Sequence, residues 1–115
     1  MAPHDELPIE CITITDGLII RPIGDIDLNQ APTLRTHIAE AFQKTPARLI
    51  IDLSQVRYMD SSGVATLVEA MQLATRGGTK LFLAAMQDRV RSIFEIARLD
   101  TVFTITADVA AAESA

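Results

Sequence analysis

The chain has 115 residues, of which 49% are apolar, so it is long enough to form one domain with a core of its own. Its 15 acidic and 10 basic side chains give a formal net charge of −5. That balance disfavours sequence-independent nucleic-acid binding, which depends on a basic face, and attraction to anionic membranes. Cys11 is the single cysteine, which excludes an intramolecular disulfide and favours a reducing compartment.

The N-terminal stretch MAPHDELP has neither the basic start nor the apolar segment of a secretory signal. No apolar run approaches the ~20 residues that a membrane-spanning helix needs. We therefore expect a soluble, cytoplasmic protein without membrane insertion. Residues 1–8 are predicted to form a flexible tail, and residues 9–112 a single domain.

The chain is predicted to begin with a β-hairpin. Residues 10–15 (ECITIT) alternate polar and apolar side chains, as a half-buried strand does, and residues 18–23 form the return strand. Asp16 and Gly17 lie between them and are a hairpin signal, because both residue types tolerate positive φ.

A helix and a buried strand are predicted next. The helix covers residues 30–44, with Pro32 in its first turn and Asp27 or Asn29 as its cap. Its apolar stripe is formed by Leu34, Ile38 and Phe42. Residues 47–53 contain a nearly unbroken apolar run, which is typical of a strand covered on both faces.

The second half of the chain alternates helices and strands. The predicted elements are a helix over residues 62–76, a strand over 80–84, a helix over 88–99, a strand over 102–105 and a helix over 107–112. The whole order is ββαβαβαβα. It predicts an α/β fold with a mixed, mostly parallel sheet of about five strands and about four helices.

The segment RYMDSSG, residues 57–63, is expected to connect the central strand to the helix that follows it. Open α/β sheets usually place their functional sites at this carboxyl end of a strand. Asp60, Ser61 and Ser62 are all good N-cap residues, and Gly63 would let the helix start pack closely against a neighbour. One helix needs only one cap, so two interpretations remain: capping alone, or a serine that is modified or bound.

Catalytic chemistry is poorly represented. Residues 59–63 read MDSSG and lack the first glycine of the G-x-S-x-G nucleophile elbow. The two histidines are His4, in the predicted tail, and His37, which is expected at the surface or boundary of a helix. One cysteine and two distant histidines fit no zinc spacing. We expect no enzyme activity, no catalytic residue, no metal and no cofactor.

Two segments resemble one known family. LIIDLSQVRYMDSSGVATLVEA, residues 49–70, resembles the phosphorylation-site region of anti-sigma-factor antagonists, which belong to the STAS-domain family. GDIDLNQAPTLRTHI, residues 24–38, is similar to that family's Gly-x-x-Asp segment leading into the first long helix. The order of elements and the chain length agree over nearly the whole sequence.

The resemblance implies a protein switch. Members bind an anti-sigma factor that is also a GHKL-type serine kinase, and so release the sigma factor without contacting nucleic acid themselves. The kinase phosphorylates the serine that matches Ser61, which ends binding, and a phosphatase reverses the modification. The other positions that match the family's motifs are Gly24, Asp27, Asp60 and Gly63, with Ser62 at the variable position.

The family also contains STAS subunits of lipid-transport ABC complexes and of stress-sensing assemblies, and both remain alternatives.

Asp27 and Asp60 are expected to orient the Ser61 hydroxyl and to oppose a phosphate placed there. The candidates for partner contact are Arg57, Tyr58, Thr66, Glu69, Ala70 and Gln72.

Overall fold

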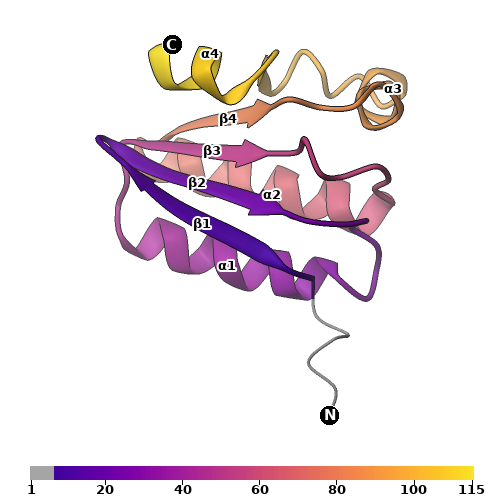
Figure 1. Ribbon diagram of the computed structural model, residues 1–115, viewed down its shortest axis with the longest axis horizontal. Helices are drawn as coiled ribbons and strands as arrows, with labels where there is room; N and C mark the ends of the chain where they lie inside the picture. Colours follow the sequence, from indigo (N-terminus) through magenta and orange to yellow (C-terminus); the bar gives the residue numbers. More distant parts are fainter. Residues whose placement is uncertain (1–6) are drawn as a thin grey trace.

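The computed structural model describes residues 7–115, which form a five-stranded sheet with four helices (Figure 1). In chain order the elements are β1 (Ile9–Ile14), β2 (Gly17–Pro22), α1 (Ala31–Gln43), β3 (Arg48–Asp52), α2 (Ser61–Gly77), β4 (Lys80–Ala84), α3 (Asp88–Ile96), β5 (Thr104–Thr106) and α4 (Val109–Ser114). The predicted fold class and the order ββαβαβαβα are confirmed.

The strands lie side by side in the order in which they occur along the chain, β1-β2-β3-β4-β5. β1 runs antiparallel to β2, and the other neighbouring pairs are parallel. All five residues of the central strand β3 are buried, as its apolar run predicted. The parallel pairing brings the loops that follow β2, β3 and β4 together at the carboxyl ends of these strands.

The two faces of the sheet are covered differently. The face towards α1 and α2 forms the larger core, which includes Leu18, Ile20, Leu49, Ile51 and Leu83. On the opposite face the short helix α4 places Ala112 against Ile19, Ile50 and Phe82. In Figure 1, α4 lies on the other side of the strands from α1.

Gly17 has a different role from the one expected. Neither Asp16 nor Gly17 has a positive φ, and the hairpin turn is formed by Thr15 and Asp16. A Cβ atom at position 17 would overlap the backbone carbonyl of Arg48 on β3. Glycine is therefore needed there for the close approach of two strands, not for turn geometry.

Helix α3 ends at Ile96, three residues before the predicted end. Arg98 takes the left-handed conformation, with φ +60°. Its N–H donates to the Glu95 carbonyl at 3.0 Å, and the Leu99 N–H donates to the Phe94 carbonyl at 2.8 Å. This is the Schellman arrangement that ends many helices. The sequence gives little warning of it, because glycine usually occupies the position that Arg98 holds.

The last two elements begin about two residues later than predicted. Val102 is not in a strand; its N–H donates to the Leu99 carbonyl, which keeps it in the turn before β5. Helix α4 begins at Val109 because Asp108 caps it, its Oδ1 accepting from the Ala111 N–H at 2.8 Å.

Of the tail predicted for residues 1–8, residues 1–6 lie outside the described residues. Leu7 is buried in the larger core, and the Pro8 carbonyl accepts a hydrogen bond of 2.8 Å from the Ile23 N–H. Between residues 7 and 115 no helix is long and apolar enough to cross a bilayer.

Candidate functional site

The loop after β2 and the loop after β3 run together beyond the ends of their strands. The Ile26 N–H donates to the Tyr58 carbonyl at 3.0 Å, and the Asp60 N–H donates to the Ile26 carbonyl at 3.1 Å. Ile26 and Met59 pair as an isolated parallel bridge, and both are buried. The predicted site residues thus come from two loops that are joined backbone to backbone.

Asp60 is the N-cap of α2. Its Oδ1 accepts from the N–H groups of Ser62, at 2.9 Å, and Gly63, at 3.3 Å. Its Oδ2 accepts from the Leu28 N–H at 3.0 Å. Both carboxylate oxygens are therefore bound to backbone N–H groups. The geometry gives Asp60 the role of a cap and a loop tether, instead of the expected role of orienting the Ser61 hydroxyl.

Asp27 has a similar role in the turn that precedes the first helix. Its Oδ1 accepts from the N–H groups of Asn29, at 3.0 Å, and Gln30, at 3.1 Å. Its carbonyl accepts from the Ala31 N–H at 2.8 Å. Of the two caps considered from the sequence, Asp27 therefore caps the turn over residues 28–30 that leads into α1, whereas the N-cap position of α1 itself is held by Gln30.

Glycine is needed at two of the motif positions for different physical reasons. A Cβ atom at Gly63 would overlap the Met59 side chain and come within 2.9 Å of the Ile26 side chain. Glycine at this position therefore lets α2 start directly against the paired loops. Gly24 instead has φ +121°, a conformation that other residues rarely adopt.

Ser61 is the first residue of α2, and its side chain is exposed. Within residues 7–115 its hydroxyl has no hydrogen-bond partner, unlike the carboxylate of Asp60 beside it. The N–H groups at a helix start favour negative charge. Because the Ser61 side chain is exposed, an enzyme can reach its hydroxyl. Because of the N–H groups, the start of α2 would also tolerate a phosphate there. Ser62 is half-buried.

An open groove lies between α1 and α2, and Ser62, the residue after Ser61, is part of its lining. This α1–α2 groove has a volume of about 240 Å³ and is lined by Leu28, Ala31, Pro32, Arg35, Ser62 and Ala65. Leu28 is 71% exposed. Arg35 bridges the two helices through an ion pair of 3.0 Å with Glu69.

Sequence reasoning missed Leu28 and Arg35 as members of this surface. The available signal was an apolar residue placed in a polar loop, DIDLNQ, just before a helix. An exposed leucine is common on protein surfaces, so the signal becomes specific only when the groove beside it is seen.

The prediction of partner contact is wrong for two residues of α2. Thr66 is 2% exposed and Ala70 is fully buried, because α2 packs on the sheet through its small residues. The Thr66 hydroxyl is satisfied by donating to the Ser62 carbonyl at 2.9 Å. The other candidates are exposed: Arg57, Tyr58, Glu69 and Gln72.

A partly buried ion pair supports the end of β3 on the other face of the sheet. Arg21 Nε lies 2.8 Å from Asp52 Oδ2, and Arg21 also binds Glu10 at 2.8 Å. Burial alone would raise the pKa of the Asp52 carboxyl. The hydrogen bonds from Arg21 and from the Ser54 N–H outweigh burial, so that pKa lies below its ordinary value.

The fold and the site describe a small α/β domain whose candidate site is an open surface around one accessible serine. A family model described as the STAS domain matches residues 9–112. The chain therefore belongs to the STAS-domain family.

Three similar proteins illustrate the relationship. The anti-sigma-B factor antagonist of Listeria monocytogenes is 33% identical over 91 residues, covering 79% of this chain and 80% of that protein. The solved structure of an anti-sigma factor antagonist from Mycobacterium paratuberculosis matches with a TM-score of 0.87 at 23% identity, over 98% of this chain and 95% of that one. The phosphorylated form of the Bacillus cell fate determinant SpoIIAA matches with a TM-score of 0.73 at 22% identity, over 93% and 97%.

Proposed function

We propose that this protein is an anti-sigma-factor antagonist that is switched by phosphorylation of Ser61. The observation that carries the proposal is the exposed Ser61 hydroxyl at the start of α2, directly after the capping Asp60. The similarity to anti-sigma-B factor antagonists supports it. In this role the unmodified protein binds an anti-sigma factor in the cytoplasm and so frees the sigma factor.

The partner would be an anti-sigma factor that is also a GHKL-type serine kinase. The kinase would supply ATP, magnesium and the catalytic base, so this chain acts as substrate and regulator. A phosphatase would restore the hydroxyl. This division of labour agrees with a site made of one accessible hydroxyl and two carboxylates that are engaged by backbone N–H groups.

The contact surface proposed for the kinase is the α1–α2 groove together with the neighbouring Tyr58 and Glu69. Leu28 offers an apolar side chain that is mostly exposed before binding, and the groove beside it is open. Buried apolar anchors surrounded by polar groups are the usual source of affinity in protein interfaces. Ser61 would then lie at the rim of the contact.

The switch would act by charge. A phosphate on Ser61 brings about −1.5 to −2 charges. The start of α2 would stabilise it by roughly 0.3–1 kcal/mol, so the fold should survive. A carboxylate of the partner about 5 Å from the phosphate would oppose binding by roughly 3 kcal/mol at an effective dielectric of about 20. Since about 1.4 kcal/mol is a factor of ten in affinity, such opposition and the desolvation of the phosphate would together weaken binding by about 100-fold or more.

The direct test is to incubate the protein with the kinase and ATP and to map the phosphate by mass spectrometry of peptides. We expect phosphate on Ser61 in the wild type and in Ser62→Ala, and none in Ser61→Ala. Label on Ser62 alone, or label that persists in Ser61→Ala, would contradict the assignment.

A further inference from the structure

Among the residues that the structure describes, strand β1 is an open edge of the sheet. It lies at one end of the strand order, and the side chains from Glu10 to Thr13 are all exposed. The other edge strand, β5, has only three residues, whereas β1 has six. A long edge presents a row of backbone N–H and C=O groups that can pair with another strand.

The register of the hairpin identifies the outward-facing groups. Ile14 pairs with Gly17 across a two-residue turn, and pairs alternate in type from there along the ladder. Hydrogen bonds to β2 are therefore assigned to residues 10, 12 and 14. The N–H and C=O groups of Ile9, Cys11 and Thr13 point away from the sheet, and we call them the β1 edge. Pro22, which has no N–H, lies opposite Ile9, as this assignment requires.

The β1 edge lacks the devices that usually prevent pairing. The strand reads IECITI, with no lysine or proline, and its one charged side chain, Glu10, is bound by Arg21 at 2.8 Å. Ile12 is 37% exposed on the α4 side of the sheet. A strand of this composition is suited to having a partner strand beside it.

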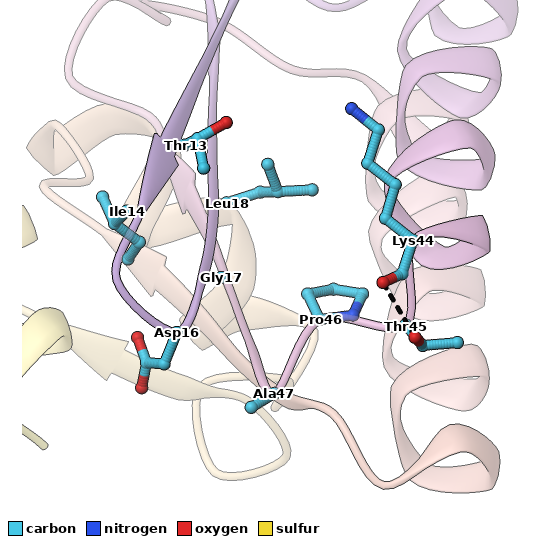
Figure 2. Close-up of a pocket in the computed structure, with 9 residues that line it drawn as sticks. All are labelled: Thr13, Ile14, Asp16, Gly17, Leu18, Lys44, Thr45, Pro46 and Ala47. Atoms are coloured by element: carbon cyan, nitrogen blue, oxygen red, sulfur yellow. Dashed lines mark hydrogen bonds between the residues drawn. The ribbon is translucent and has the colours of Figure 1, made fainter.

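There is also room on the α1 side of this edge. A cavity of about 330 Å³ lies between the hairpin and the end of α1, where Figure 2 shows Thr13 and Leu18 facing Lys44. A second cavity, of about 60 Å³, lies between Cys11 and Lys44 of the same helix. Although Cys11 is exposed, its thiol is partly screened from water here, which raises the pKa of that thiol. Side chains from an added strand would enter this space.

We propose that two copies of the chain associate through their β1 edges, antiparallel, to form one continuous ten-stranded sheet. This proposal goes beyond the switch and does not depend on it. A two-fold axis at Ile12 sets Ile12 against Ile12 of the second copy, and Cys11 opposite Thr13. An axis at Glu10 would instead bring two Glu10 carboxylates face to face, which disfavours that register.

The helices leave space for this arrangement. The β2 strands of the two copies would lie three strand spacings apart, about 14 Å, and α1 packs over β2. Helices with side chains are about 10–12 Å wide, so two α1 helices fit side by side on the same face.

The facing sides of the two helices are also complementary in charge. Glu40 and Lys44, one turn apart, both line the cavity beside Cys11. Because the two-fold axis runs the two α1 helices antiparallel, Glu40 of one copy would face Lys44 of the other. This self-complementarity favours a second copy over an unrelated peptide as the occupant.

The test is sedimentation velocity of the full chain over a range of concentrations. We expect the mass to rise from 12.5 kDa to twice that value. Ile12→Lys should weaken self-association at least tenfold. Leu73→Lys changes a side chain of equal exposure on α2 and should have no effect. A monomer at all concentrations, or an unchanged dimer in Ile12→Lys, would overturn the proposal, as would a monomer that instead binds extended peptides at β1.

Cross-linking tests the register. Thr13→Cys places a thiol opposite Cys11 of the second copy and should form intermolecular disulfides faster than the wild type, in which two Cys11 residues are diagonal neighbours. Faster oxidation of the wild type would overturn the axis at Ile12. Ser61→Asp should dimerise like the wild type, so failure of the dimer and failure of the switch are distinguishable.

Discussion

The Asp60 carboxylate accepts a hydrogen bond from the Leu28 N–H at 3.0 Å, across 32 residues of sequence. The same side chain caps α2 through its other oxygen. One residue therefore fixes both the helix start that presents Ser61 and the loop that presents Leu28. The proposed phosphorylation site and the proposed contact surface share this support.

Asp60→Ala should destabilise the fold by about 1–2 kcal/mol, because the cap of α2 and the tether to Leu28 are both lost. Asp60→Asn retains an acceptor oxygen and should lose less. Urea denaturation measures both values. Equal stability of the alanine variant and the wild type would show that the cap is dispensable.

Gly63→Ala should destabilise the protein by about 1–3 kcal/mol, because the new methyl group meets the side chains of Met59 and Ile26. Gly77→Ala is the matched control. It adds the same group to the same helix, where nothing but the adjacent residues and the helix's own backbone lies within 4 Å. The control should be neutral or stabilising by up to about 1 kcal/mol. Similar thermal denaturation of the two variants would refute the close-packing explanation.

Leu28→Ala should leave the stability unchanged within about 0.5 kcal/mol, since this side chain is mostly exposed. It should weaken binding of the anti-sigma factor about tenfold if Leu28 is an anchor of the contact. Ile96→Ala removes an equally apolar and even more exposed side chain from α3 and should bind normally. Titration calorimetry gives both affinities. Equal effects of the two substitutions would exclude a specific role for Leu28.

Arg21→Met should destabilise the protein by about 2–3 kcal/mol at pH 7, because the Asp52 carboxylate stays buried without its partner. In the wild type the pKa of Asp52 is lowered, so this contribution to stability is present above about pH 4 and is lost as the pH falls through the folded-state pKa.

In the variant, burial should instead raise that pKa. The difference in stability between wild type and variant should therefore shrink as the pH falls from 7 to 3. Urea denaturation across this range checks the sign, and a difference that does not change with pH would contradict the assignment.

The order of elements was predictable because the apolar spacing changes clearly between strands and helices. The end of α3 was not, because Arg98 occupies a left-handed position that glycine usually marks. The burial of Thr66 and Ala70 on α2 was not predicted, because apolar periodicity gives weight to large side chains. This helix buries Thr66, Ala70 and Ala74 and leaves Val64 and Met71 at its margins.

The candidate site was predictable only in part. The run Asp60-Ser61-Ser62-Gly63 is local in sequence, and its position at a helix start follows from the βα order. The α1–α2 groove depends on which helices become neighbours and on the hydrogen bond from the Leu28 N–H to the Asp60 side chain. Contacts between residues so far apart in the chain have no local sequence signal.

The most direct test of the switch is titration of the anti-sigma factor with the same protein in two forms, unmodified and phosphorylated on Ser61. We predict that phosphorylation weakens binding by about 100-fold or more while the melting temperatures of the two forms stay within a few degrees. Equal affinities would contradict the account, and so would a loss of binding that is accompanied by unfolding of the phosphorylated form.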